Sequence, residues 1–220
     1  MTESPNAADE TPAESLPVAP GGLPKAAKQA IGFVVVGLLI TGALVANYKL
    51  SPYHFGVVEE GVLYRSGILR AANFEKVIKE KGIKTVVVLP SKIARDPKPE
   101  WYLRQKADCA RLGVTQVDMP MRSETPPSEA QIAEWIGLLE DKAAQPILVH
   151  CANGVVRTGE LVAIFEREFK GKGNREVYDG LPKFGHSFEK PRRAKVKEFI
   201  LNYKTRAERG AGTDSKAPAK

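Results

Sequence analysis

The chain has 220 residues, 43% of them hydrophobic and 27% charged, and its formal net charge is +7. This composition is typical of a globular chain with a core of its own. Two cysteines, Cys109 and Cys151, are too few for a disulfide scaffold. Neither they nor the three scattered histidines have the spacing of metal ligands, so no metal or cofactor is expected.

The charge is unevenly distributed along the chain. The first 24 residues carry four acids and no Lys or Arg, so the remaining residues carry a net charge of +11. A basic body suits an anionic partner such as a phosphate ester, an acidic lipid surface or a nucleic acid. Composition alone does not choose among these partners.

Residues 1–28 are predicted to form a disordered tail, because the first 24 are rich in Pro, Ala, Glu and Ser without hydrophobic periodicity. Residues 29–48 follow without a charged side chain. As a helix this run spans roughly 30 Å, the thickness of the bilayer's hydrocarbon core, and we predict one transmembrane helix. Two alternatives to a membrane span are disfavoured. A buried core helix would be unusually apolar on all sides for so small a protein. A cleaved signal peptide would need an Ala-x-Ala site after the run, and none follows it.

The charges that flank the apolar run favour one orientation in the membrane. Lys25 and Lys28 precede the run closely, whereas only Lys49 follows it closely. The positive-inside rule therefore places the N-terminus in the cytoplasm. The rest of the chain is expected on the non-cytoplasmic (periplasmic) side, anchored by a single pass.

Residues 51–203 alternate between strand and helix patterns. β-Branched and apolar runs predict strands at 55–58, 62–65, 83–89, 114–121 and 146–149. Apolar residues at helical spacing predict helices at 74–82, 99–112, 128–139, 157–169, 175–181 and 191–203. The alternation predicts an α/β domain with a mostly parallel central sheet flanked by helices, the run 83–89 being buried on both faces. Residues 204–220 are predicted to be a disordered basic tail.

The stretch 146–159 (PILVHCANGVVRTG) carries the chemistry. A buried strand leads into Cys151, Arg157 comes six residues later, and a helix begins there. A cysteine that attacks phosphorus must be a thiolate, although the pKa of a free cysteine is about 8.5. A loop at the start of a helix points backbone N–H groups and the positive end of the helix dipole inward, and both favour a thiolate and a bound phosphate.

Other residues of this stretch fit the same chemistry. Gly154 allows the backbone to close around phosphate oxygens where a side chain would obstruct it. The planar fork of Arg157 matches two phosphate oxygens. Thr158 can donate its hydroxyl to the sulfur, and His150 can orient the loop through its ring N–H.

The Cys-x5-Arg pattern, preceded by His and followed by Thr-Gly, resembles the signature of the cysteine-based protein tyrosine and dual-specificity phosphatases. Residues 61–66 (GVLYRS), 82–88 (GIKTVVV), 100–102 (EWY) and 185–186 (GH) resemble further segments of the bacterial dual-specificity-like branch. The resemblance covers residues 55–203.

The resemblance implies that Cys151 is the nucleophile, which forms a phosphocysteine, and that Arg157 is the phosphate clamp. It implies that the loop backbone binds the phosphate oxygens at Ala152, Asn153, Gly154, Val155 and Val156. The implied substrate is a phosphorylated protein (phosphotyrosine or phosphoserine/threonine) or a small phosphate ester, with no nucleic-acid partner.

The general acid is where the sequence departs from the family. Its members usually supply an Asp some thirty residues before the cysteine, and the position that matches it most directly is Ser123. Glu124 precedes a Pro-Pro pair in this loop and is favoured over Asp118, which has about the usual spacing but falls within a predicted strand. Asp96 is a third option. A structural role is open for both leading acids, Glu124 as a solvated side chain and Asp118 as the partner of an arginine such as Arg65.

Three further expectations follow from single positions. Val155 and Val156 make an apolar loop wall, which gives less help to a highly charged substrate such as an inositol polyphosphate. Cys109 falls in a predicted helix and is assigned to packing, with a redox partnership to Cys151 as the alternative. His54 and His186 are assigned structural roles.

Competing functions remain at this stage. The main alternative to a phosphatase is a catalytically weak, membrane-tethered module that binds phosphate without turnover. Arsenate reductases with Cys-x5-Arg carry it near the N-terminus, and sulfurtransferases lack the six-residue step to Arg-Thr-Gly, so both are disfavoured.

Overall fold

The structure is a computed structural model that describes residues 24–50, 52–182, 184, 186 and 188–214. For residues 44–50 and 211–214 it describes the helical backbone only. The chain divides into two units, Met1–Lys49 and Leu50–Lys220, and each is described by itself. Most of the predicted N-terminal tail lies outside the described residues.

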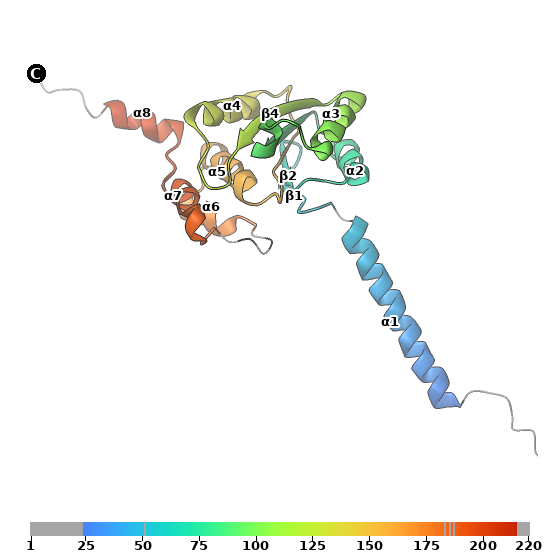
Figure 1. Cartoon of the computed structure of the whole chain (residues 1–220). Helices are drawn as coiled ribbons and strands as arrows, with labels where there is room; N and C mark the ends of the chain where they lie inside the picture. The colour runs from blue at the N-terminus through green and yellow to red at the C-terminus, as the bar shows by residue number, and fades with distance from the viewer. Residues whose placement is uncertain (1–23, 51, 183, 185, 187, 215–220) are drawn as a thin grey trace, which may run out of the picture. The chain divides into compact units, whose positions relative to one another are not determined.

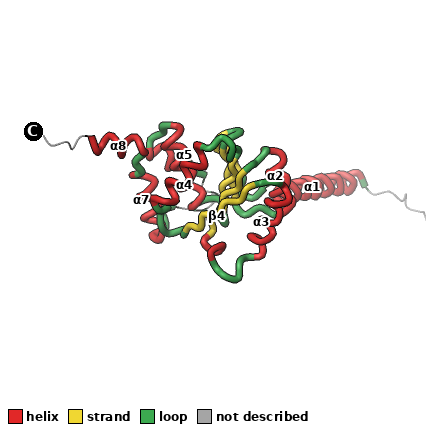
Figure 2. Tube along the Cα trace, turned by 90° about the horizontal axis from the view of Figure 1, so that it is seen from above, coloured by secondary structure: helices red, strands yellow, loops and turns green. Residues whose placement is uncertain are grey.

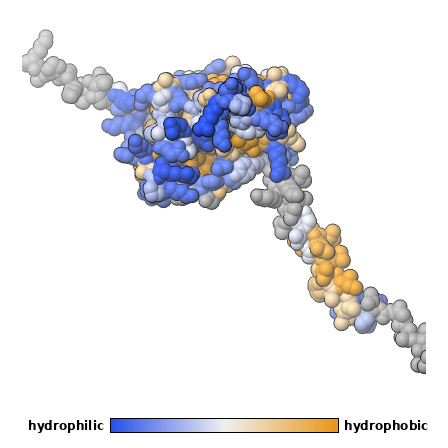
Figure 3. All heavy atoms as spheres, viewed as in Figure 1, coloured by the Kyte–Doolittle hydropathy of each residue, from blue (hydrophilic) through white to orange (hydrophobic). Residues whose placement is uncertain are grey.

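Helix α1 (Lys25–Leu50), preceded by Pro24, makes up the described part of the first unit, and only its last residue, Leu50, falls in the second. It begins before the predicted start at residue 29, because the Lys28 N–H already donates to the Pro24 carbonyl and Lys and Ala are good helix formers. The window Lys25–Ala43 has a mean hydropathy of 1.7 and is long and apolar enough to cross a membrane, a test that a signal sequence near the N-terminus also passes. Figure 3 shows its apolar surface in orange.

The second unit is built on a sheet flanked by helices (Figure 1). The sheet has five strands in the order β1-β2-β5-β3-β4. Its strands are β1 (Gly56–Glu59), β2 (Leu63–Ser66), β3 (Thr85–Pro90), β4 (Thr115–Met121) and β5 (Ile147–His150). Among the described strands only the β1–β2 pair is antiparallel, which confirms the predicted mostly parallel sheet. Every residue of β3 is buried, as its unbroken apolar run predicted.

Helices cover both faces of the sheet (Figure 2). One face packs against α2 (Ala71–Lys81) and α3 (Glu100–Leu112), and the other against α4 (Glu129–Glu140) and α5 (Val156–Lys170). Alternate side chains of β3 divide between the faces, Val86 and Val88 toward α2 and α3, and Val87 toward α4 and α5. Short 3-10 helices span Ser91–Ala94 and Pro191–Arg193, and α6 (Asn174–Gly180) and α7 (Ala194–Asn202) pack beside α5.

Helix α4 begins where the sequence predicted. Ser128 is its N-cap and accepts from the Gln131 N–H at 3.3 Å, while the Gln131 side chain accepts from the Ser128 N–H at 3.0 Å. These two bonds form a capping box, which the spacing of Ser128 and Gln131 in the sequence also indicates. The cap fixes the end of the 122–127 loop, which carries a candidate general acid.

The predicted disordered tail from residue 204 is wrong in its first half, because Arg206–Asp214 forms helix α8. Salt bridges join α8 to earlier helices: Arg206 with Glu140, Arg206 with Glu168, Arg209 with Glu129, and Glu208 with Arg167. The basic side chains that suggested a solvated tail meet carboxylates of α4 and α5 instead. Residues 215–220 lie outside the described part.

Candidate active site

The Cys-x5-Arg loop lies at the carboxyl edge of the sheet. Cys151 directly follows β5, whose last residue, His150, pairs with Ser66 of β2 on one side and Val88 of β3 on the other. The loop then enters α5, which begins at Val156. The carboxyl ends of parallel strands and the N-terminus of a helix therefore meet at one point, where anions are bound favourably.

Gly154 is required by the shape of this loop. Its φ is +63°, a conformation that side chains disfavour, and a Cβ there would lie 2.4 Å from the carbonyl carbon and oxygen of Ser66. The backbone of β2 thus packs directly against the loop. Only glycine fits at this position.

Three successive carbonyls of the loop each accept a hydrogen bond from outside it. The bonds run from Ile68 N–H to Ala152 O (3.2 Å), from His54 Nδ1 to Asn153 O (2.7 Å) and from Arg65 Nη2 to Gly154 O. In a planar trans peptide the C=O and the following N–H point in opposite directions. Holding the carbonyls outward therefore turns the next three N–H groups to the inner side, and the first of these, Asn153 N–H, interacts with the Cys151 sulfur.

Cys151 is buried, with 2% of its surface exposed. Burial by itself raises the pKa of its thiol, but attraction to Arg157 and interactions with the Thr158 side chain and with the Thr158 and Asn153 backbone outweigh burial and leave the pKa below its ordinary value. The site therefore favours a thiolate, as a nucleophile requires.

Arg157 lies in the first turn of α5, half-buried, with Nη1 3.5 Å from the Met121 carbonyl. It lines a cleft of about 550 Å³ together with Ala152. The other described lining residues are Ile68, Pro90, Ser91, Lys92, Arg95, Trp101, Arg122, Ser123 and Glu124. Four cations and one acid thus face the cleft among the described residues, an electrostatic setting that favours an anionic ligand.

The structure brings Glu124 into this cleft. The Ser123 hydroxyl donates to Glu124 at 2.5 Å and lowers the pKa of the carboxyl; burial opposes this, and Arg192, Arg122 and Arg157 lower the pKa further. The free protein therefore holds Glu124 as a carboxylate. A bound phosphate dianion beside it would raise that pKa again, because like charges disfavour ionisation.

The structure does not bring the other two acids into the cleft. Asp118 is exposed on edge strand β4 and accepts from the Tyr102 hydroxyl (2.5 Å) and the Gln116 amide (2.9 Å), rather than pairing with Arg65. Its side chain is held against α3, three residues before the strand ends. Asp96 is exposed in the loop after β3 and is not among the described lining residues.

His150 lies directly before the loop, and its side chain is held by Gln105 of α3. It is 1% exposed, and the Gln105 amide nitrogen lies 3.0 Å from Nε2, so Nε2 accepts and the ring proton lies on Nδ1. Burial lowers the pKa of His150 to about 4, against an opposing interaction with the Cys151 backbone. The ring is therefore neutral at physiological pH.

Sequence reasoning missed Glu160 as a residue of this site. Glu160 is fully buried in α5, and neither carboxyl oxygen has a hydrogen-bond partner among the described residues. Burial and the nearby Cys151 raise its pKa well above the ordinary value, against the pull of Arg157. The only signal in the sequence is a single acid directly before the apolar run 161–165.

His54, to which the sequence assigned a structural role, and Arg65 hold the loop carbonyls described above. Arg65 is 2% exposed, and burial lowers its pKa to about 10, so it remains protonated at neutral pH. Cys109 packs on the α2–α3 face, whereas Cys151 belongs to the cluster on the opposite face, and burial raises the pKa of Cys109 to about 11. Among the described residues, no three His, Cys, Asp or Glu side chains gather as metal ligands would.

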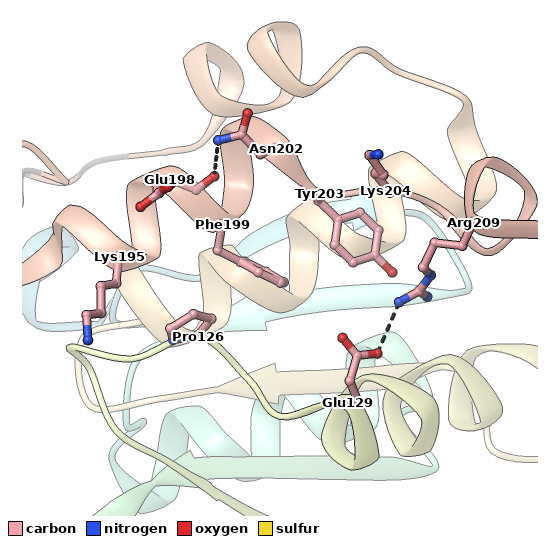
Figure 4. A pocket seen from close by; sticks show the side chains of 9 residues that line it. All are labelled: Pro126, Glu129, Lys195, Glu198, Phe199, Asn202, Tyr203, Lys204 and Arg209. Atoms are coloured by element: carbon pink, nitrogen blue, oxygen red, sulfur yellow. Dashed lines mark hydrogen bonds and ion pairs between the residues drawn. The ribbon is translucent and has the colours of Figure 1, made fainter. Parts of the chain in front are cut away.

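A second hollow lies away from this loop. It is a groove of about 630 Å³ between the start of α4, α7 and α8, and Figure 4 shows the residues that line it. Its apolar floor contains Phe199 and Tyr203, and its rim carries the Arg209–Glu129 ion pair. None of the candidate catalytic residues lines it.

An α/β sheet with a Cys-x5-Arg loop at the start of a helix defines a cysteine-based phosphatase. The family described as DSP-PTPase phosphatase fused to NAD+ kinase matches residues 56–198. The chain therefore belongs to this family, within the cysteine-based dual-specificity and tyrosine phosphatases.

Individual proteins agree with this assignment. The chain is 30% identical over 117 residues to inositol diphosphatase DSP3 of Arabidopsis thaliana, covering 53% of this chain and 55% of that protein. It is 32% identical over 84 residues to probable NAD kinase 2 of Oryza sativa, covering 38% of this chain and 8% of that protein. The chain thus spans about half, or far less, of these relatives.

Solved structures share the fold. The catalytic domain of the PP-IP phosphatase SIW14 from S. cerevisiae superposes with a TM-score of 0.56 at 23% identity, covering 77% of this chain and 97% of that one. Tk-PTP superposes with a TM-score of 0.52 at 19% identity, covering 67% and 93%.

Proposed function

We propose that this protein hydrolyses phosphate monoesters through a phosphocysteine formed on Cys151. The observation that carries the proposal is the convergence of a buried cysteine, inward-turned N–H groups and Arg157 at the start of α5. Family membership adds to it, since the class uses cysteine chemistry.

In the first step the Cys151 thiolate attacks phosphorus, an S–P bond forms, and the bond from phosphorus to the leaving oxygen breaks with its electrons on that oxygen. The loop N–H groups and Arg157 bind the equatorial oxygens, where charge concentrates. In the second step water attacks phosphorus and the S–P bond breaks. Inorganic phosphate leaves and the thiolate is restored.

Glu124 is our candidate for the proton donor to the leaving oxygen and for the base that then activates water. It must bind a proton when substrate arrives, although the free site holds it ionised. A leaving group that needs little protonation relaxes this demand. Aryl phosphates and phosphoanhydrides have such leaving groups, whereas the phosphoserine of a protein does not.

Within the phosphate esters we favour a substrate that carries more than one phosphate. Lys92, Arg95 and Arg122 line the cleft beyond the loop and offset the apolar Val155–Val156 wall that counted against a polyanion. The names of two similar proteins, an inositol diphosphatase and a PP-IP phosphatase, point the same way. Phosphotyrosine remains the second candidate, with Trp101 in the cleft as a surface for its ring.

The test is a substrate panel on the full chain with a metal chelator present, comparing an aryl phosphate, a phosphoanhydride, phosphotyrosine and phosphoserine peptides. We expect turnover that resists the chelator and is abolished by Cys151→Ser. Phosphate binding by the wild type without turnover of any compound would favour the alternative, a phosphate-binding module.

We also propose that α1 anchors the protein in a membrane, with its N-terminus in the cytoplasm. The helix has the length and hydropathy to span, and Lys25 and Lys28 precede it. We expect the full chain to stay with membranes in alkaline carbonate, and protease added from the non-cytoplasmic side to digest the domain. Release by carbonate contradicts the anchor, and protection from the protease contradicts the orientation.

A further inference from the structure

His54 lies against the catalytic loop although 99 residues separate it from Asn153. Its Nδ1 is 2.7 Å from the Asn153 carbonyl oxygen. Its ring stacks on Tyr53, with centroids 4.0 Å apart, and on Phe184, with centroids 4.2 Å apart and only 8° between the planes. The ring is therefore oriented by two neighbours as well as by its own hydrogen bond.

The backbone around His54 is adapted to this contact. Its φ is +50°, in the left-handed region, which His and Asn tolerate better than most side chains. The preceding Tyr53 carbonyl accepts from the Gly67 N–H at 2.9 Å, which ties the segment to the residue after β2. The strained conformation is thus kept by contacts that direct the imidazole at the loop.

Of the three donors that hold the loop carbonyls, His54 acts on the peptide between Asn153 and Gly154. With the carbonyl of this peptide held outward, the Gly154 N–H points to the inner side. A carbonyl is an acceptor only, so Nδ1 must carry the proton. Loss of this donor would leave the peptide free to turn, which glycine at the next position permits.

We propose that His54 is a positioning residue of the catalytic loop, which directs the Gly154 N–H at the phosphoryl group by holding the Asn153 carbonyl. The proposal rests on the phosphatase function proposed above. His54 comes four residues after the end of α1 at Leu50, so the beginning of the folded domain contributes to the shape of the loop.

The test uses the full chain in detergent, with three variants of His54. His54→Phe keeps an aromatic ring without a donor, His54→Gly removes ring and donor but suits a φ of +50°, and His54→Asn keeps an N–H donor at a tolerated residue. The measurements are kcat and KM for an aryl phosphate, the Kd for inorganic phosphate by calorimetry, and the melting temperature. Tyr53→Phe, which loses only the hydroxyl 3.3 Å from the Asn153 side chain, is the matched control.

We expect His54→Phe and His54→Gly to lower kcat by about 10- to 100-fold, somewhat less than direct loss of an oxyanion donor, and to weaken phosphate binding. His54→Asn should recover most of both, and Tyr53→Phe should match the wild type. Wild-type kcat and Kd in His54→Gly overturn the proposal, even if His54→Phe is impaired, since strain is then the cause. An equal loss in His54→Asn and His54→Gly overturns it as well.

The phosphate measurement separates this proposal from the phosphatase function. A wild type that binds phosphate without turning over any substrate contradicts the enzymatic function alone. The Kd values of the His54 variants then still decide whether this side chain organises the loop.

Discussion

The cleft beside Cys151 and the groove between α4 and α7 are hollows of similar size, about 550 and 630 Å³, in the same domain. Four cations and one acid line the cleft, whereas three cations and two acids line the groove. Ala152 and Arg157, which line the cleft, belong to the loop that follows the buried Cys151 thiol, whereas the groove has an apolar floor. Uncompensated charge and converging donors, rather than volume, distinguish the candidate site.

The largest expected effect follows from changing the cation that faces the sulfur. Arg157→Lys keeps the charge but loses the fork that binds two oxygens, so kcat should fall by about 100- to 1,000-fold. Circular dichroism should show an unchanged fold. Wild-type turnover in this variant would remove Arg157 from the mechanism and weaken the contrast between cleft and groove.

Gly154→Ala tests the packing of the loop on β2. The new Cβ would meet the Ser66 backbone at 2.4 Å, so we expect a loss of about 1–3 kcal/mol in unfolding free energy and a large loss of turnover. Gly171→Ala is the control, because its φ of +65° is similar but nothing lies within 4 Å. The control should cost about 1 kcal/mol and leave kcat unchanged. If both substitutions had the same effect, the left-handed φ, and not contact with the Ser66 backbone, would be the cause of the loss.

Replacing Glu124, which lines the cleft, should affect turnover more than replacing Asp118, which lies outside it. Glu124→Gln should lower kcat by about 100-fold for an alkyl phosphate and much less for an aryl phosphate, because only the former needs a proton on its leaving group. Asp118→Asn should be close to the wild type, since Asp118 contacts Tyr102 and Gln116 outside the cleft. The reverse order, measured with both substrates, would assign the acid role to Asp118.

Glu160, buried in α5 close to Cys151, should make the stability of the domain depend on pH, whereas no buried acid is among the described residues that line the groove. The folded protein keeps a proton on Glu160 that the unfolded chain releases above pH 4.3 or so, and stability should therefore fall as pH rises, by at most about 1.4 kcal/mol per pH unit. Glu160→Gln should remove this loss and stabilise the protein more at pH 8 than at pH 5. Urea unfolding at both pH values measures the difference, and an equal effect at both would contradict a raised pKa.

The smallest effect is expected in the groove. Arg209→Gln breaks an ion pair with Glu129, whose side chain is 82% exposed, and should change the unfolding free energy by about 0–1 kcal/mol. Turnover of the aryl phosphate should be that of the wild type. A substantial loss of turnover would show that the groove contributes to catalysis and that the comparison with the cleft is wrong.

The sequence predicted the sheet and the loop because their signals are local. The apolar run of β3, the Ser128–Gln131 cap and the step from Cys151 to Arg157 each lie within a few residues. The strand order, with β5 between β2 and β3, places Cys151 at the centre of the sheet edge. This order depends on pairing between distant strands, so it cannot be predicted from any one segment.

The remaining site residues depend on distant contacts. His54 meets Asn153 and Arg65 meets Gly154 across 99 and 89 residues, and nothing in their local patterns indicates a bond to a carbonyl. Glu124 reaches the cleft and Asp118 does not. This difference depends on how β4 pairs with β3 and on where the loop after β4 turns. Helix α8 was missed for a similar reason, because its stabilising carboxylates come from α4 and α5.

Helix α8 has no buried side chain among its described residues, and its own members of the tertiary salt bridges are 39–50% exposed, although two of their partners, Glu168 (4%) and Arg167 (11%), are not. Surface ion pairs weaken as dissolved ions screen them, over a distance of about 8 Å at physiological ionic strength. In concentrated salt the last helix should therefore detach while the sheet persists. Its amides would then exchange hydrogen for deuterium long before those of β3, and the salt content of the buffer would decide where the folded domain ends.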